Sequence, residues 1–192
     1  MLQNTQRSSR VSEEQNEAGS EIQELGGLIR SIPDFPKKGI DFKDITTLLQ
    51  NSDAFRQVVD HLAHRYADKS VDAVVAAEAR GFILGGALAY RLGAGFVPVR
   101  KKGKLPYKTY EVTYDLEYAT ETIAIHQDAL KPGETVVVLD DLLATGGTAG
   151  AVLELVEQLG AKVLEVAFLI ELTFLKGRDR LKSCPVYSAI KV

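Results

Sequence analysis

Residues 134–150, ETVVVLDDLLATGGTAG, join an aliphatic run to two acids and a glycine-rich turn without a gap. Residues 136–139 show no polar alternation, which is typical of a strand covered on both faces of a parallel sheet. Helical periodicity resumes over residues 151–159, and Gly160 follows as a helix stop. The stretch therefore predicts a strand, a loop and a helix in succession.

The turn in this unit has the features of a phosphate site. A loop that leaves a parallel strand and opens a helix presents unpaired N–H groups and the positive end of the helix dipole. Gly146 and Gly147 let the backbone approach a ligand, and Thr145 and Thr148 add hydroxyl donors. The turn lacks the Gly-Lys-Ser/Thr of a nucleotide P-loop and the Gly-x-Gly-x-x-Gly of a dinucleotide fold, so it belongs to neither class.

Asp140 and Asp141 precede the turn, and they narrow the choice of ligand. Two carboxylates beside a phosphate would repel it unless they met hydroxyl groups or a metal. Ionised carboxylates only accept hydrogen bonds, and a vicinal diol supplies two donors at matching spacing. A sugar phosphate is therefore favoured over the alternative, in which the pair is a solvated strand end.

The string VVVLDDLLATGGT resembles the phosphoribosyl-diphosphate (PRPP) motif of type I phosphoribosyltransferases. In that family the acids hold the ribose hydroxyls and the turn holds the 5′-phosphate. The resemblance implies a PRPP and AMP site made of Asp140, Asp141, Ala144, Thr145, Gly146, Gly147 and Thr148. Members that use 6-oxopurines usually carry an aspartate at the position of Ala144, whereas Ala-Thr-Gly-Gly-Thr resembles the adenine-specific members.

A second strand, loop and helix unit precedes this one. The strand expected over residues 71–77 runs into Glu78-Ala79-Arg80-Gly81 and a helix over residues 82–92. Arg80 at a helix N-terminus can hold a diphosphate with two parallel hydrogen bonds. EARGFILG resembles the pyrophosphate loop of the same family. After the next strand, over residues 96–100, the resemblance implies that Arg100 and Lys104 assist diphosphate binding, some of these basic residues acting across a dimer interface.

Residues 32–47, IPDFPKKGIDFKDITT, have the composition of a fixed loop with an aromatic face. They follow a run at helical spacing from Ile22, which predicts a helix that Pro33 ends. The segment resembles the adenine-binding loop of the adenine-specific enzymes. The resemblance implies that Phe42 stacks on the purine and that the backbone around it reads the purine edge; the residues implied are Ile40, Asp41, Phe42 and Lys43. One C=O and one N–H suffice to reject a 6-oxopurine.

Residues 105–118 are rich in tyrosine and threonine and suit a β-hairpin or mobile flap. The element Asp-Leu-Glu-Tyr at residues 115–118 matches the adenine-specific enzymes. The resemblance implies that Glu117 exchanges a proton near the purine N7 and that Tyr118 helps to seal the site, so the implied catalytic residues are Arg80, Glu117 and Tyr118. It further implies Mg²⁺ held mainly by the PRPP diphosphate and water, with no dedicated protein metal site, and a homodimer.

Composition sets the broad class. The chain of 192 residues, 45% hydrophobic, is predicted to form one domain over residues 21–192, preceded by a disordered or loosely attached extension over residues 1–20. The net charge of −3 gives no general attraction to nucleic acid or anionic membrane. One cysteine and no apolar leader or membrane-length run predict a soluble, cytoplasmic protein.

The fold expected is α/β, with a central, mainly parallel sheet flanked by helices, a small N-terminal hood and a flexible flap. The function implied is purine salvage, in which adenine and PRPP give AMP and diphosphate. One alternative is a transferase for hypoxanthine, guanine or xanthine, against which Ala144 and the Phe42 loop argue. Another is a regulatory PRPP sensor, but the sequence carries no helix-turn-helix that would bind DNA.

Overall fold

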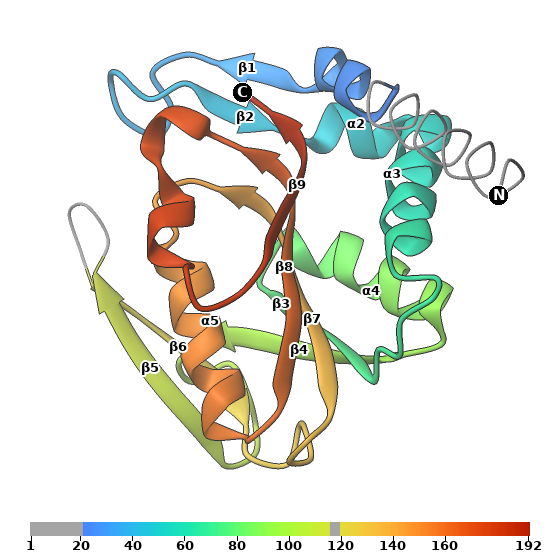
Figure 1. Ribbon diagram of the computed structural model, residues 1–192. Coiled ribbons are helices and arrows are strands. Elements are labelled where there is room, and N and C mark those ends of the chain that lie inside the picture. Colours follow the sequence, from blue (N-terminus) through green and yellow to red (C-terminus); the bar gives the residue numbers. More distant parts are fainter. Residues whose placement is uncertain (1–20, 116–119) are drawn as a thin grey trace, which may run out of the picture. The chain divides into compact units, whose positions relative to one another are not determined.

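The computed structural model describes residues 21–115 and 120–192 (Figure 1). The chain groups into two compact units, one ending at His61 and the other beginning at Leu62, and each is described by itself. The predicted extension over residues 1–20 lies outside the described residues. The prediction of a single domain over residues 21–192 stays a prediction.

The N-terminal unit is built around a two-stranded antiparallel sheet. Its elements are η1 (Leu25–Leu28), β1 (Arg30–Ile32), β2 (Phe42–Asp44), α2 (Thr46–Gln50) and most of α3 (Ser52–Arg65). The prediction of one helix up to Pro33 is wrong, because residues 21–24 are helical but the chain then tightens into η1 and enters β1. Two glycines at positions 26 and 27 weaken a continued helix, and extended pairing of Ser31 with Lys43 replaces it.

The C-terminal unit contains a seven-stranded sheet in the order β5-β6-β4-β3-β7-β8-β9. Its strands are β3 (Ala73–Ala77), β4 (Gly95–Lys101), β5 (Thr109–Asp115), β6 (Thr120–His126), β7 (Thr135–Leu143), β8 (Lys162–Glu171) and β9 (Val186–Lys191). β4, β3, β7, β8 and β9 are parallel to their neighbours in that series, and the β5–β6 hairpin joins β4 in antiparallel fashion. The predicted mainly parallel sheet is confirmed.

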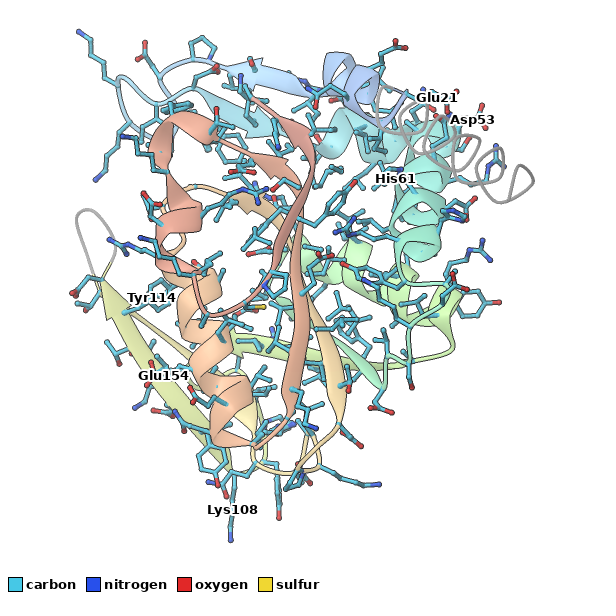
Figure 2. The ribbon with its side chains drawn as sticks, in the orientation of Figure 1. Glu21, Asp53, His61, Lys108, Tyr114 and Glu154 are labelled. Atoms are coloured by element: carbon cyan, nitrogen blue, oxygen red, sulfur yellow. The ribbon has the colours of Figure 1, made fainter. Side chains whose placement is uncertain are left out.

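Helices α4 (Gly81–Leu92) and α5 (Gly147–Gln158) cover opposite faces of this sheet. Successive strand residues point to opposite faces. On β3, Ala76 lies against α4, whereas Val75 and Ala77 belong to the core cluster that includes the buried side of α5. The other side of α5 carries the exposed Glu154 (Figure 2). Among the described residues, no helix has both the length and the apolar character needed to cross a membrane.

Strand β7 fixes the place where the two helices begin. It pairs with β3 on one side and β8 on the other, and Val136, Val137 and Leu139 are fully buried. The strand is longer than residues 136–139 and continues through both aspartates to Leu143. Because β3 and β7 are adjacent and parallel, the loops that lead into α4 and α5 meet at one edge of the sheet.

Two short 3₁₀ helices, η2 (Thr173–Leu175) and η3 (Gly177–Arg180), connect β8 to β9. Arg178 anchors this connection. Its guanidinium donates to the carboxylate of Glu171 at 2.7 Å, to the carbonyl of Val186 at 2.7 Å and to the hydroxyl of Ser188 at 3.1 Å. The connection is therefore tied to both strands that it joins.

The close packing of α4 on the sheet can be tested at Gly85. A Cβ there would lie 2.8 Å from the Cβ of Ala76 and 3.1 Å from Cε2 of Phe96. We expect Gly85→Ala to lower the free energy of unfolding by about 1–3 kcal/mol in urea denaturation, because overpacking outweighs the gain in helix propensity. Gly150→Ala in α5 is the matched control, since a Cβ there meets nothing within 4 Å, and it should raise stability by about 0.5–1 kcal/mol. Equal effects of the two substitutions would contradict this account of the packing.

Candidate active site

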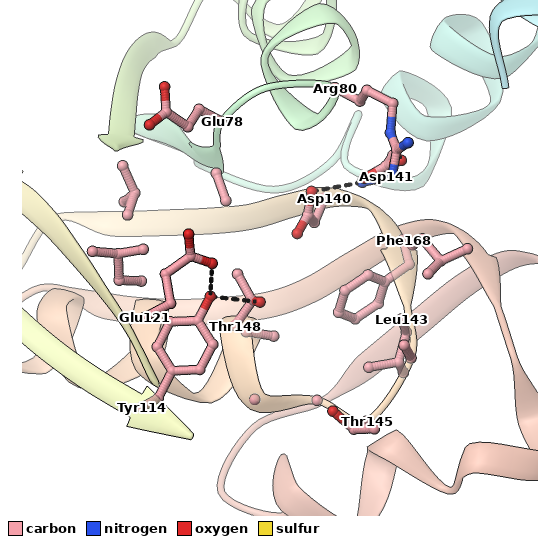
Figure 3. Close-up of a pocket in the computed structure, with 18 of the residues that line it drawn as sticks. Glu78, Arg80, Tyr114, Glu121, Asp140, Asp141, Leu143, Thr145, Thr148 and Phe168 are labelled. Carbon is pink, nitrogen blue, oxygen red and sulfur yellow. Dashed lines mark hydrogen bonds and ion pairs between the residues drawn. The ribbon is translucent and has the colours of Figure 1, made fainter. Parts of the chain in front are cut away.

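A cavity of about 420 Å³ opens at the carboxyl ends of β3 and β7, within the C-terminal unit (Figure 3). The loop after β3, the end of β7, the turn into α5 and the part of the β5–β6 hairpin next to its loop all contribute to it. Of the residues predicted to bind PRPP, those that line this cavity are Arg80, Asp140, Asp141, Ala144, Thr145, Gly146, Gly147 and Thr148. The structure thus brings together two sequence motifs that are sixty residues apart.

The two aspartates occupy different environments. Asp141 is only 6% exposed, and its Oδ2 accepts a hydrogen bond from Nε of Arg80 at 2.5 Å, which also makes an ion pair. Asp140 instead accepts at Oδ1 from the backbone N–H of Asp141 at 2.9 Å. Burial, together with the neighbouring charge of Asp141, raises the pKa of Asp140 well above its usual value. One acid is therefore neutralised by a cation, and the other is kept in a site that disfavours its charge.

Gly81 makes room for the Asp140 carboxylate at the start of α4. A Cβ at Gly81 would lie 2.8 Å from Oδ1 of Asp140 and 3.3 Å from the carbonyl oxygen of Leu139. The glycine after Arg80 is thus explained by close approach between α4 and the end of β7.

The turn before α5 is packed directly against the main chain of η3. Gly146 has φ of 82°, in the left-handed region, and a Cβ there would lie 2.5 Å from the carbonyl oxygen of Gly177. A Cβ at Gly177 would in turn lie 2.2 Å from the carbonyl oxygen of Ala144. The η3 segment, anchored by Arg178, therefore supports the turn from outside. Gly177 was not predicted from the sequence, because the residues that it packs against, Ala144 and Gly146, are more than thirty residues away along the chain.

Lys101, rather than Arg100 or Lys104, lines the cavity. Its ammonium group pairs with Glu121, and its backbone N–H donates to Oε1 of Glu78 at 2.6 Å. Arg100 donates from Nε to Glu78 at 3.1 Å and from Nη1 to the carbonyl of Lys104 at 3.2 Å. A signal for Lys101 exists in the sequence: Val97, Val99 and Lys101 alternate along β4 and share one face.

The contacts of Glu78 lower its pKa. Burial alone would raise the pKa of this carboxyl group, but the N–H of Lys101 and the guanidinium of Arg100 outweigh burial and hold the pKa below its usual value. Glu78 thus stays charged and fixes both basic residues at the end of β4.

Tyr114 and Glu121 are further cavity residues that the sequence analysis missed. They are paired across the β5–β6 hairpin, in which Tyr114 lies opposite Glu121. The Tyr114 hydroxyl is 3.2 Å from Oε2 of Glu121 and 3.0 Å from Oγ1 of Thr148 (Figure 3). The hairpin is thereby linked to the first turn of α5.

The residues predicted to catalyse at the flap, Glu117 and Tyr118, lie outside the described residues. The hairpin is described up to Asp115 and again from Thr120, and these two residues form its last pair. The roles of Glu117 and Tyr118 stay predictions.

The residues predicted to bind adenine belong to the N-terminal unit. Phe42 is half-buried on β2, and its ring meets the ring of Phe35 edge to face at a centroid distance of 5.2 Å. Lys43 donates from Nζ to Asp41 at 2.8 Å and to Ser31 at 2.7 Å. The backbone N–H and C=O of Ile40 are both used within the loop, by Lys37 and Phe35. The roles of Ile40, Asp41, Phe42 and Lys43 in binding adenine stay predictions.

The chain is similar to known proteins in sequence and in fold. The family model for the phosphoribosyl transferase domain matches residues 45–186. Adenine phosphoribosyltransferase from Syntrophotalea carbinolica is 61% identical over 170 residues, which cover 88% of this chain and 99% of that protein. The crystal structure of adenine phosphoribosyltransferase from Thermoanaerobacter pseudethanolicus superposes with a TM-score of 0.86 at 52% identity, covering 89% of this chain and 99% of that one.

A third relative has been crystallised with ligands. The adenine phosphoribosyltransferase of Saccharomyces cerevisiae, complexed with adenine and an imino-altritol bisphosphate, has a TM-score of 0.84 at 42% identity, covering 88% of this chain and 98% of that one. A cavity with an acid pair, an adjacent Thr-Gly-Gly-Thr turn and a family model that covers most of the chain place it in the phosphoribosyltransferase family. Within that family, it belongs with the adenine phosphoribosyltransferases.

The raised pKa of Asp140 predicts that Asp140→Asn stabilises the fold. An acid whose pKa is raised in the folded state lowers stability at every pH above its unfolded pKa, and the full cost is reached once pH exceeds the folded pKa. We expect the variant to melt about 2–4 °C higher at pH 7, which corresponds to about 1 kcal/mol, and this gain should shrink as the pH falls towards about 4.

Asp141→Asn is the matched control for this measurement. It removes the carboxylate that pairs with Arg80, so it should lower the melting temperature at pH 7. Thermal melts across pH 4–8 measure both effects. A lower melting temperature for Asp140→Asn at neutral pH would contradict the assignment of Asp140 as the acid with the raised pKa.

Proposed function

We infer that this protein transfers the phosphoribosyl group of PRPP to adenine, forming AMP and diphosphate for purine salvage. The observation that carries this inference is the cavity in which an acid pair, a helix-opening turn and Arg80 converge. The adenine and bisphosphate in the yeast relative are the two kinds of ligand that such a reaction requires.

The acid pair and the turn of the cavity bind different parts of PRPP. Asp140 and Asp141 accept hydrogen bonds from the ribose hydroxyls, and the backbone of residues 144–148 holds the 5′-phosphate at the N-terminus of α5. A ribose hydroxyl that donates to Asp140 adds a hydrogen bond to a carboxylate whose surroundings disfavour its charge. Binding the sugar therefore offsets part of the cost of keeping that acid charged.

The diphosphate lies towards Arg80 and Lys101. Both cations line the cavity and both are paired with acids, Arg80 with Asp141 and Lys101 with Glu121. A leaving diphosphate develops negative charge, and these fixed cations stabilise it without a covalent intermediate. Arg100 and Lys104, at the same end of β4, would act on the diphosphate from the second subunit of a dimer.

Adenine stacks on Phe42, and backbone groups of residues 41–43 read its 6-amino edge. A 6-oxopurine would leave those buried groups unpaired, which accounts for selection of adenine. Glu117 exchanges the purine proton, and Tyr118 helps to exclude water from the electron-poor ribose carbon.

Magnesium is bound through the substrate in this proposal. Among residues 21–115 and 120–192, no group of three or more His, Cys, Asp or Glu side chains is arranged to hold a metal ion. The carboxylates of Asp141, Glu78 and Glu121 each form an ion pair with a basic residue. The donor set therefore fits an ion held by PRPP oxygens and water, and the charge of that ion would assist departure of the diphosphate.

A homodimer is supported by the outer side of α4. Ile83 and Tyr90 lie two helical turns apart on one side, and they are 45% and 87% exposed. Phe96, also exposed, packs its ring against Phe82 of the same helix. Large apolar side chains grouped on one face are typical of an interface. The single cysteine, Cys184, which is free, fits a reducing cytoplasm.

The substrate assignment is tested by measuring diphosphate release from PRPP with adenine, hypoxanthine, guanine and orotate in turn. We expect turnover with adenine alone, because only adenine presents a donor at position 6 and an acceptor at N1. Asp140→Asn should weaken PRPP binding about tenfold or more while leaving the protein folded, since an amide replaces a charged acceptor. Turnover with another base but not with adenine would refute the assignment.

The dimer is tested by replacing Tyr90 with glutamate. A charge buried in an apolar interface is unfavourable, so Tyr90→Glu should shift the protein from dimer to monomer at micromolar concentration, as measured by analytical ultracentrifugation. Tyr107→Glu is the control, because Tyr107 is 56% exposed but lies before β5, where its ring contacts His126. A monomeric parent protein, or a dimer unaffected by Tyr90→Glu, would contradict the proposed interface.

A further inference from the structure

Three side chains from separate elements meet at the rim of the cavity. Tyr114 comes from β5, Glu121 from β6 and Thr148 from the first turn of α5. The Tyr114 hydroxyl lies between the other two, 3.2 Å from the Glu121 carboxylate and 3.0 Å from the Thr148 hydroxyl (Figure 3). Glu121 also pairs with the ammonium group of Lys101.

The position of Tyr114 over the turn depends on a glycine. A Cβ at Gly147 would lie 3.3 Å from Cδ2 of Tyr114, so a larger residue would push the ring away. Burial raises the pKa of the Tyr114 hydroxyl, so it keeps its hydrogen at neutral pH. The hydroxyl is therefore a single donor with two acceptors in reach.

The number of hydroxyl hydrogens in this cluster decides which hydrogen bonds change when a phosphate binds. The Glu121 carboxylate can only accept, while the Tyr114 and Thr148 hydroxyls each have one hydrogen to donate. With Glu121 as the final acceptor, Thr148 donates to Tyr114 and Tyr114 donates to Glu121. A phosphate group at the turn also only accepts, so it requires the hydrogen of Thr148.

We propose that Tyr114 is a positioning residue for the 5′-phosphate, acting through Thr148. When Thr148 donates to the phosphate, Tyr114 turns its own hydrogen from Glu121 to Oγ1 of Thr148. The resulting chain, from Tyr114 through Thr148 to the phosphate, strengthens the bond of Thr148 because hydrogen bonds in series polarise one another. Glu121 retains its ion pair with Lys101 throughout. This role rests on the proposed function of the turn as the 5′-phosphate site.

The test is a double-mutant cycle on ligand affinity, measured by calorimetry with ribose 5-phosphate and, separately, with diphosphate. Thr148→Val should weaken ribose 5-phosphate binding about tenfold, and Tyr114→Phe about three- to tenfold. The double variant should bind no more weakly than Thr148→Val, because Tyr114 has no hydroxyl to act through once Thr148 is replaced. Diphosphate affinity should be the same in all four proteins, since it is held at Arg80 and Lys101.

The outcomes separate this role from general distortion and from the proposed function. Ribose 5-phosphate affinity unchanged by Tyr114→Phe, or a loss equally large with and without Thr148, would overturn the role of Tyr114. A parallel loss of diphosphate affinity would point to a shifted hairpin and would overturn it as well. If Thr148→Val itself leaves ribose 5-phosphate binding unchanged, the assignment of the turn is wrong and the role of Tyr114 falls with it.

Discussion

The arrangement of the cavity depends on two adjacent carboxylates in different environments: Asp141 pairs with Arg80, and the surroundings of Asp140 raise its pKa. Side chains alternate along β7, so Asp140 and Asp141 point to opposite faces of the strand although they are neighbours in sequence. Asp141 pairs with Arg80, which lies in the loop after the adjacent strand β3, and Asp140 lies beside Gly81. A sheet that was not parallel at β3 and β7 would separate these partners. The glycine at the start of α4 and the ion pair with Arg80 both serve to accommodate this pair of acids.

The turn between β7 and α5 depends on a second constraint, which is close main-chain packing. Gly146 and Gly177 each leave a space that a carbonyl oxygen of the other segment occupies, so neither position tolerates a side chain without movement. Arg178 holds the η3 segment through Glu171 on β8 and Ser188 on β9. The shape of the turn thus depends on residues that do not line the cavity. A backbone that must present several N–H groups at once benefits from such rigid support.

Local patterns in the sequence were sufficient to predict the two cavity motifs and a mainly parallel sheet. Aliphatic runs before Arg80 and before Asp140 indicated buried parallel strands, and their loops meet in one cavity as expected. The helix expected up to Pro33 did not form, because Gly26 and Gly27 favour a tighter turn and β2 offers a pairing partner that no local pattern announces. Gly177 and Tyr114 were missed for a related reason: their roles come from contacts with residues far away in sequence.

Lys101 illustrates a different kind of miss. The basic run at the end of β4 was recognised, and Arg100 and Lys104 were predicted to assist diphosphate binding. Lys101 was not predicted, although the period of a strand puts it, rather than Arg100, on the cavity side. Arg100 faces the other way and, with Glu78, fixes the loop that carries Arg80. Arg100 therefore acts on this cavity by holding Glu78, while Lys101 places a positive charge within it. Of two adjacent basic residues, Arg100 thus supports a loop and Lys101 faces the cavity. Of the two adjacent acids, Asp141 is paired with Arg80 and Asp140 has a raised pKa.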